Sequence, residues 1–357
     1  MDFSLDDEQQ MIVQTVKKFA DRDLRGWTGD ADRAGAPPER LTSAASDLGF
    51  FLDAVPADAD GLLEGEYSHT TRALRGFELG RGCAALAALL ETNVEPALAV
   101  GKWGSAAAKQ SLFASLASGG LATLAHDSRG TLEITGEGEL RVTGKLGPLP
   151  ALGVASHVLV VGRDVLFLVA TEGLKREAIT PSGWRAAKWG VAQLDGYKVA
   201  PEFVVSRDRA AIDEVLAWAR VSLAARAAGV ATAAMEYAEH YAKERVQFGQ
   251  PIGTFESLIR LRDDAQTNTM AARLLAVHAA WAIDKGHANA ADLASRARVL
   301  GGDVVTRATI DAVQIFGGYG FVNDYPVEKL MRDARAFEAL LGDERLGRVL
   351  SQKSSKE

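Results

Sequence analysis

The chain has 357 residues, of which 47% are hydrophobic and 24% charged. These are ordinary values for a soluble globular protein with a sizeable core. The formal charge of −7 at pH 7 argues against a nucleic-acid partner, because such partners are bound through clustered basic residues. At roughly 100 to 200 residues per domain, a chain of this length has room for two or three domains.

The cysteine count, the histidine spacing and the N-terminal sequence narrow the class of protein further. Cys83 is the only cysteine, which excludes an intrachain disulfide and a multi-cysteine zinc site. We expect it to be a small buried thiol rather than a nucleophile. Histidines such as His126 and His157 have no companions at ligand spacing, so we expect no metal site. The acidic start lacks the features of a signal peptide, and no run reaches the ~20 apolar residues of a membrane span, so we expect a cytoplasmic protein without a membrane partner.

Residues 1–118 predict an all-α domain. Apolar residues recur there at three- and four-residue steps, as in Ile12, Val16 and Phe19, and again from Leu79 to Leu90. Between these runs, AVPADADGLLEGEYS is rich in turn formers and acids, which predicts a loop.

Residues 119–206 predict a small β domain, barrel-like or sandwich-like. LEIT and LRVT flank GEGE, and VLVV and VLFLVA flank GRD, which indicates two hairpins in succession. YKVAPEFVV closes the segment.

Residues 207–357 predict a helical bundle. The periodicity indicates three long helices, with Gly286 as a C-cap of the second and small residues around Gly229 that allow close helix approach. The α, β, α order makes the fold class α+β.

Two motifs in this last segment are candidate ligand sites. Arg245 begins RVQFGQPI, where its guanidinium is suited either to phosphate-type oxygens or to the carbonyls of its own helix. Gln314, Gly317 and Gly318 belong to QIFGGYG, where glycines allow close backbone approach to a ligand or simply end the helix. GGYG does not follow a strand, so it does not indicate a nicotinamide site.

Together the two motifs, their separation and the run MRDAR resemble the acyl-CoA dehydrogenases. These flavoenzymes remove hydrogen from the α and β carbons of a CoA thioester. The resemblance implies an N-terminal α domain, a middle β domain and a C-terminal four-helix bundle. It implies FAD shared across a subunit interface, an acyl-CoA substrate and an electron-transfer flavoprotein as acceptor. The FAD-contacting residues that it implies are Arg245, Gln247, Phe248, Gln314, Gly317 and Gly318.

The family's catalytic base is missing from both of its usual positions. In many members a glutamate lies nine residues after the arginine that begins RDAR, and this count leads from Arg332 to Leu341. The alternative position, on the helix before RVQFG, corresponds to Ala219. The adjacent Arg220 matches an arginine near the family's acyl-CoA site, but it can also be read as a helix-surface charge.

The middle segment is shorter than the middle domain of a typical member and also departs from the family pattern. Members carry a segment like TEPxAGSD and an aromatic-Ile-Ser/Thr segment that wrap the flavin ring, whereas this chain has LAHDSRGTLEI and TGKLGPLPALG. Leu146, Gly147 and Pro148 lack the expected hydroxyl and aromatic groups. We therefore expect the chain's own flavin-ring site to be lost.

Three hypotheses follow. In the first, the chain is the degenerate subunit of a heteromeric acyl-CoA dehydrogenase, a heterotetramer with a second chain of the family, acting in fatty acid or steroid side-chain catabolism. In the second, it is a self-sufficient homo-oligomer in which Glu338 or Glu344, three residues either side of Leu341, serves as a displaced base. In the third, it is a non-catalytic assembly or binding protein.

Overall fold

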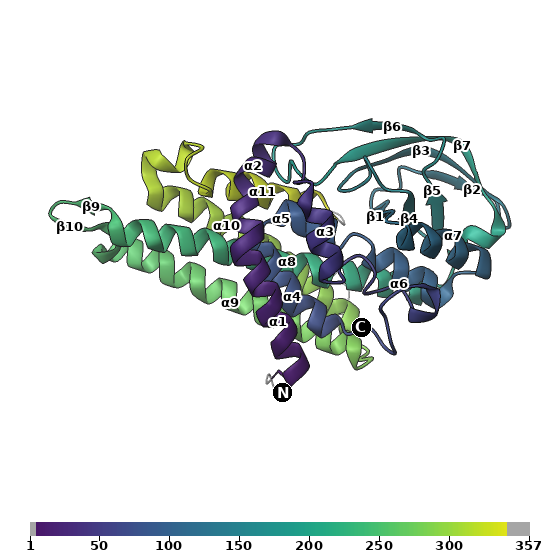
Figure 1. Cartoon of the computed structure of the whole chain (residues 1–357), viewed down its shortest axis with the longest axis horizontal. Helices are drawn as coiled ribbons and strands as arrows, with labels where there is room; N and C mark the ends of the chain where they lie inside the picture. Colours follow the sequence, from purple (N-terminus) through teal and green to yellow (C-terminus); the bar gives the residue numbers. More distant parts are fainter. Residues whose placement is uncertain (1–4, 341–357) are drawn as a thin grey trace.

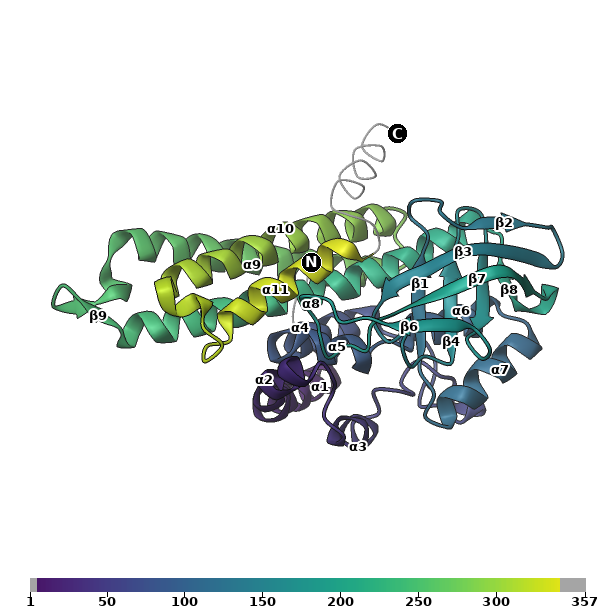
Figure 2. The same cartoon turned by 90° about the horizontal axis from the view of Figure 1, so that it is seen from above.

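The computed structural model describes residues 5–340. A long helical bundle extends to one side of the molecule and a β domain lies at the other end, with the N-terminal helices packed along the bundle (Figure 1). The predicted α+β architecture is confirmed, and the turned view shows the same separation of bundle and sheets (Figure 2).

The N-terminal part is entirely helical apart from its connections. The side chain of Asp6 caps the first helix by accepting a hydrogen bond from the backbone N–H of Gln9 at 2.7 Å. The predicted loop is confirmed, except that it contains one short helical turn, η2. The elements are α1 (Asp7–Phe19), η1 (Ala20–Leu24), α2 (Arg25–Ala34), α3 (Arg40–Asp47), η2 (Ala57–Ala59), α4 (His69–Gly82), α5 (Ala84–Leu90), α6 (Val94–Trp103) and α7 (Ala106–Ala117).

Cys83 separates α4 from α5 because its backbone is extended, with φ −163°. The expected buried thiol is confirmed: the side chain is 1% exposed, and its Sγ accepts a hydrogen bond from Thr28 Oγ1 at 3.2 Å. The apolar periodicity alone had predicted no break in the run.

The β domain consists of two four-stranded sheets, ordered β1-β4-β5-β8 and β2-β3-β7-β6. Both predicted hairpins are confirmed, with Glu133 opposite Thr143 and Val161 opposite Leu166. β1 pairs with β4 in parallel, a long-range pairing that no local turn could indicate. The strands are β1 (Ala122–His126), β2 (Glu133–Thr135), β3 (Leu140–Leu149), β4 (His157–Val161), β5 (Leu166–Ala170), β6 (Lys175–Ala178), β7 (Gly190–Val199) and β8 (Val204–Ser206), with the turn η3 (Pro201–Phe203) before β8.

The bundle contains the three predicted long helices and a shorter fourth. Gly286 follows the end of the second helix with φ +63°, the left-handed conformation expected of its position. The elements are α8 (Arg209–Glu244), β9 (Val246–Gln247), β10 (Gln250–Pro251), η4 (Ile252–Thr254), α9 (Glu256–Asp284), α10 (Ala290–Phe316), η5 (Gly317–Phe321) and α11 (Val327–Ala339).

Glycine allows α8 and α4 to cross closely. A Cβ on Gly229 would lie 2.0 Å from the carbonyl oxygen of Phe77, so any larger residue would push the two helices apart. This contact brings charged residues of α4 and α8 together in the interior. No helix within the described part of the chain is long and apolar enough to cross a membrane.

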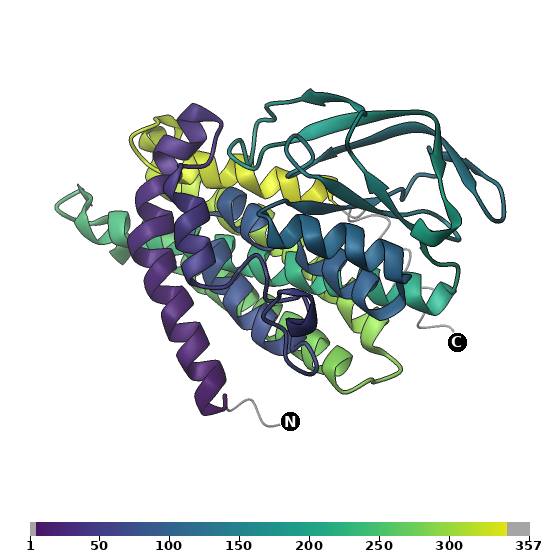
Figure 3. The same ribbon diagram turned by 45° about the vertical axis from the view of Figure 1, so that its right-hand side comes forward.

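One loop of the β domain docks on α11 of the bundle. Asp333 of α11 is fully buried and accepts a hydrogen bond from the backbone N–H of Trp184 at 2.7 Å. A Cβ on Gly183 would lie 2.2 Å from the carbonyl oxygen of Arg332, so the loop rests directly on the α11 backbone. Figure 3 shows the sheets lying above α6 and α7 and beside α11.

Candidate functional site

The first motif lies at the end of the bundle remote from the β domain (Figure 1). We call this end the bundle tip and define it by Arg245, Gln247, Phe248, Gln314 and the glycine pair 317–318. Phe248 is 94% exposed and has φ +52°, and Gln247 beside it is exposed as well. The ring touches Phe255 edge-on, with centroids 6.3 Å apart, but most of its surface faces solvent on a strained backbone. The tip therefore presents its motif outward.

Aromatic rings hold the motif in place. Tyr241 stacks on Phe316 with ring centroids 4.2 Å apart, which fixes the end of α8 against the end of α10. The guanidinium carbon of Arg245 lies 5.5 Å from the ring centroid of Tyr319. This geometry differs from an arginine folded back on its own helix, and it leaves the guanidinium edge available to an acceptor.

The second motif is exposed at the same end. Gln314 lies in the last turn of α10 with its side chain in solvent. Gly317 ends the helix at φ +58°, which accounts for glycine there. Gly318 has no such requirement, and a Cβ added to it would meet nothing within 4 Å. Its missing side chain therefore serves no contact within the described chain, as expected where an outside ligand approaches the backbone.

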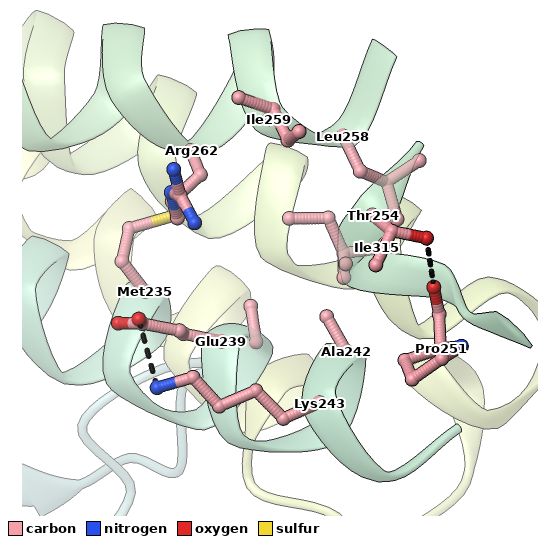
Figure 4. A pocket seen from close by; sticks show the side chains of 12 residues that line it. Met235, Glu239, Ala242, Lys243, Pro251, Thr254, Leu258, Ile259, Arg262 and Ile315 are labelled. Atoms are coloured by element: carbon pink, nitrogen blue, oxygen red, sulfur yellow. Dashed lines mark hydrogen bonds and ion pairs between the residues drawn. The ribbon is translucent and has the colours of Figure 1, made fainter. Parts of the chain in front are cut away.

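A cavity of about 310 Å³ lies beside the tip, between α8, the turn after β10 and the start of α9. Its walls are mainly apolar, and at its edge Lys243 Nζ lies 3.0 Å from Glu239 Oε1 (Figure 4). The volume is at the lower end of the range of small-molecule sites. The labelled lining residues are Met235, Glu239, Ala242, Lys243, Pro251, Thr254, Leu258, Ile259, Arg262 and Ile315.

The remaining candidate positions meet at a second place, which we call the junction cavity. It brings together Ala219, the end of the described chain at Leu340, and both altered middle-domain segments, represented by Leu124 and Pro150. Its volume is about 70 Å³, room for about two waters at ~30 Å³ each. Leu341 and Glu344 lie outside the described residues. The full lining is Ala88, Glu91, Thr92, Glu95, Thr123, Leu124, Pro150, Trp184, Ala219, Leu223, Arg226 and Leu340.

Buried ion pairs occupy the space beside the junction cavity. The carboxylate of Glu91 lies at their centre: its Oε1 is 3.2 Å from Arg75 Nε, and its Oε2 is 3.7 Å from Arg72 and 4.0 Å from Arg226. Ser222 Oγ donates a further hydrogen bond to Glu91 at 3.1 Å. Burial alone would raise the pKa of Glu91, but the three guanidiniums hold it below its usual value.

Two more carboxylates complete this network. Arg72 Nη1 is 2.8 Å from Glu95, and Arg75 pairs with Asp53. The guanidiniums of Arg72 and Arg75 are largely buried, at 3% and 11% exposure. Of this network, Glu91, Glu95 and Arg226 line the junction cavity, and each of these buried charges lies beside an opposite charge.

Trp184 closes the junction cavity on the side of the β domain. Its indole is fully buried and packs edge-on against Phe337, with ring centroids 4.8 Å apart. The backbone has φ +52°, a conformation maintained by the bond from Trp184 N to Asp333. The sequence analysis did not identify this residue, because nothing in the local pattern relates residue 184 to α11.

Arg220 and Glu338 do not line the junction cavity. Arg220 is 8% exposed, so its interpretation as a helix-surface charge is wrong. The pKa of Arg220 is lowered to about 10, mainly by burial, with Asp213 opposing this effect and the charge of Arg298 adding to it. Glu338 is partly exposed, and its carboxylate accepts a hydrogen bond from Arg335 at 2.6 Å. No group of three or more potential metal ligands occurs among residues 5–340.

Comparisons with known proteins define the family. Residues 6–120 match the model "Acyl-CoA dehydrogenase, N-terminal domain", and residues 209–353 match "Acyl-CoA dehydrogenase, C-terminal domain". The two matches together cover well over half of the chain. The protein therefore belongs to the acyl-CoA dehydrogenase family, whose cofactor is FAD, and it is an oxidoreductase of that family.

Individual relatives and solved structures support the same family. An acyl-CoA dehydrogenase of Bacillus subtilis is 42% identical over 134 residues, which are 38% of this chain and 35% of that protein. A probable acyl-CoA dehydrogenase of the same organism is 27% identical over 98% of both chains. The butyryl-CoA dehydrogenase structure from Megasphaera elsdenii superposes with a TM-score of 0.88 over 100% of both chains, at 25% identity.

The described residues suit FAD unequally at the two places. At the tip, the partly exposed guanidinium of Arg245, an exposed amide and an open glycine backbone are suitable groups for phosphate oxygens. At the junction, about 70 Å³ bordered by paired charges cannot accept a flavin ring with a thioester beside it.

Proposed function

We propose that the chain is the base-lacking subunit of a heteromeric, FAD-dependent acyl-CoA dehydrogenase. In this arrangement its bundle tip completes the FAD site of a partner chain. The observation that carries the proposal is the contrast between an exposed, intact tip and a filled junction with Ala219 at a base position.

The geometry of α8 supports a partner's site rather than the chain's own. Ala219 and Glu244 lie on one uninterrupted helix, so they are roughly 38 Å apart at 1.5 Å per residue. A ring bound at the junction would lie far beyond the reach of Arg245. The motif at the tip is therefore positioned for a flavin held by another chain.

Each chain would then have a separate task. The partner would supply the flavin-ring site, the acyl-CoA thioester site and the base that removes the α-proton, while FAD would accept the hydride from the β-carbon. In this chain Arg245 would hold phosphate oxygens, Gln247 and Gln314 would donate amide hydrogen bonds, and Phe248 would exclude water. An electron-transfer flavoprotein would then reoxidise the cofactor.

Further details belong to the same proposal. We place the domain limits at residues 1–118, 119–206 and 207–357, and the assembly in the cytoplasm as a heterotetramer. Its pathway would be fatty acid or steroid side-chain catabolism. Arg220 would be a residue near the acyl-CoA site.

The test is the flavin content of the chain purified alone and with a family member encoded beside it. We expect weak FAD binding and little acyl-CoA oxidation for the chain alone, and one FAD for each pair of chains in the complex. Tight stoichiometric flavin with turnover in a strict homo-oligomer would favour Glu338 or Glu344 as the base and overturn the proposal. Colourless protein in every combination would favour an assembly or binding protein.

A further inference from the structure

The side chain of Arg245 at the bundle tip is held by an aromatic ring instead of a carboxylate. Arg245 directly follows α8, and its guanidinium carbon lies 5.5 Å from the ring centroid of Tyr319. Its side chain forms no hydrogen bond or ion pair with any residue in the described part of the chain. A loose arginine samples many rotamers, and a ligand that must fix it loses affinity for that reason. The contact with Tyr319 is therefore the one feature here that can orient Arg245 before a ligand arrives.

The turn η5 places the ring of Tyr319 beside Arg245. Tyr319 lies in the middle of this turn, directly before Gly320. A Cβ on Gly320 would lie 2.6 Å from the carbonyl oxygen of Val313, so only glycine allows the turn to rest on the last turns of α10. The end of α10 is in turn stacked on the end of α8 through Phe316. This packing brings Tyr319 to the residue that follows α8.

Two further rings fix the orientation of Tyr319. Its ring centroid lies 6.4 Å from that of Tyr241 and 6.0 Å from that of Tyr325, which it meets edge-on. Tyr319 is nevertheless 47% exposed, and its hydroxyl forms no hydrogen bond with any described residue. Neither burial nor the hydroxyl accounts for tyrosine at this position. The feature that remains is the face of the ring.

A guanidinium can use a ring face and a phosphate at the same time. The ring attracts the positive charge from above the guanidinium plane, within the ~6 Å at which such contacts are effective. The N–H donors point outward within that plane, so they stay available to phosphate oxygens. A carboxylate partner would occupy the same donors and compete with a phosphate. The aromatic contact therefore orients Arg245 without using the groups that bind the ligand.

We propose that Tyr319 is a positioning residue, whose ring face holds the guanidinium of Arg245 in the orientation that receives a phosphate oxygen of FAD. The inference rests on the proposed function, because it concerns the same contact of the tip with a partner's cofactor. It adds a residue that touches no ligand itself and acts only through Arg245.

The orientation of Arg245 can be tested on the full chain without a partner. In protein with isotope-labelled arginine, the Nε proton of Arg245, assigned by its loss in Arg245→Lys, should be shifted upfield by the ring current of Tyr319. We expect Tyr319→Leu to remove this shift and Tyr319→Phe to keep it. The control is Phe321→Leu, which removes a 72% exposed ring of the same turn that lies over no described cation. A shift that survives Tyr319→Leu would overturn the proposal.

A double-mutant cycle on the assembled complex tests the effect on FAD, with flavin fluorescence as the measure of affinity. Tyr319→Leu should weaken FAD binding about two- to fivefold, the size of an exposed contact between a cation and a ring. Tyr319→Phe should restore the affinity, and Tyr319→Leu should cause no further loss in a chain that already carries Arg245→Ala.

The same cycle separates failure of this inference from failure of the proposed function. If Arg245→Ala weakens FAD binding but Tyr319→Leu does not, or if the two losses add, Tyr319 does not act through Arg245 and only the positioning role is overturned. If Arg245→Ala leaves FAD affinity unchanged, the tip does not hold the cofactor, and both proposals are overturned.

Discussion

The bundle tip and the junction cavity belong to the same long helix but differ in every physical respect. At the tip, α8 ends in exposed groups held by stacked rings, beside a cavity of about 310 Å³. At the junction, α8 passes between buried arginines and carboxylates around about 70 Å³. Groups that serve another molecule must stay exposed, whereas an unused interior site can be filled. An exposed tip and a filled junction are what we expect of a chain that completes a partner's site.

Filling the junction with charges has energetic consequences. A buried ion network is seldom better than apolar packing of the same volume, but it becomes strongly destabilising when one member is removed. The junction should therefore be sensitive to single substitutions in stability, and the tip in cofactor binding. This difference in sensitivity between the two regions can be measured.

Glu91→Ala should give the largest effect. The change leaves the guanidiniums of Arg72, Arg75 and Arg226 without their common carboxylate, at a cost of about 3 to 5 kcal/mol in the free energy of unfolding. Urea denaturation measures this cost. The matched control is Asp30→Ala, which breaks an exposed pair with Arg33 and should cost less than about 1 kcal/mol. Equal small effects would mean that the network is not what fills the junction.

Arg245→Ala and Gln314→Ala should come next, and they should affect cofactor retention instead of folding. Each lost charge-assisted or amide hydrogen bond would cost up to about 1.5 to 3 kcal/mol, or roughly ten- to a hundredfold in FAD affinity of the assembled complex. The rate and extent of flavin release on dilution measure this loss of affinity. Arg260→Ala, which removes an exposed arginine paired with Glu256, is the control. Unchanged flavin retention in both tip variants would remove the tip from the FAD site.

The residues of the tip could be located from the sequence, whereas those of the junction network could not. The tip lies in contiguous motifs, so resemblance could identify Arg245 and Gln314, and local periodicity could identify the long helices and both hairpins. Glu91, Arg72 and Arg226 come from three separate helices, and only the crossing at Gly229 brings them together. The parallel pairing of β1 and the position of Trp184 also depend on tertiary contacts. Patterns along the chain carry no signal for such contacts.

The pH dependence of the free energy of unfolding should reveal the buried imidazole of His69. Burial lowers the pKa of His69 from 6.5 to about 3, so between those values the unfolded chain binds a proton that the folded chain does not. Stability from this residue is therefore complete above pH 6.5 and is lost as the pH falls, by up to about 1.4 kcal/mol per pH unit. His69→Phe should flatten the pH dependence of unfolding in that window, measured as the difference from the unchanged chain. An identical pH dependence would contradict the buried neutral ring.

Leu341→Glu should have the smallest effect, namely no appearance of acyl-CoA oxidation by the chain alone. A base accelerates the reaction only when substrate and flavin are already positioned around it. The junction next to Leu340 has a volume of only about 70 Å³, too small to position them. The measurement is anaerobic flavin reduction by acyl-CoA, with Ala219→Glu as the equivalent change at the other base position. Rapid flavin reduction in either variant would mean that this chain lacks only the carboxylate of a complete enzyme. The junction would then be a working flavin site, and its difference from the tip would not support the proposed function.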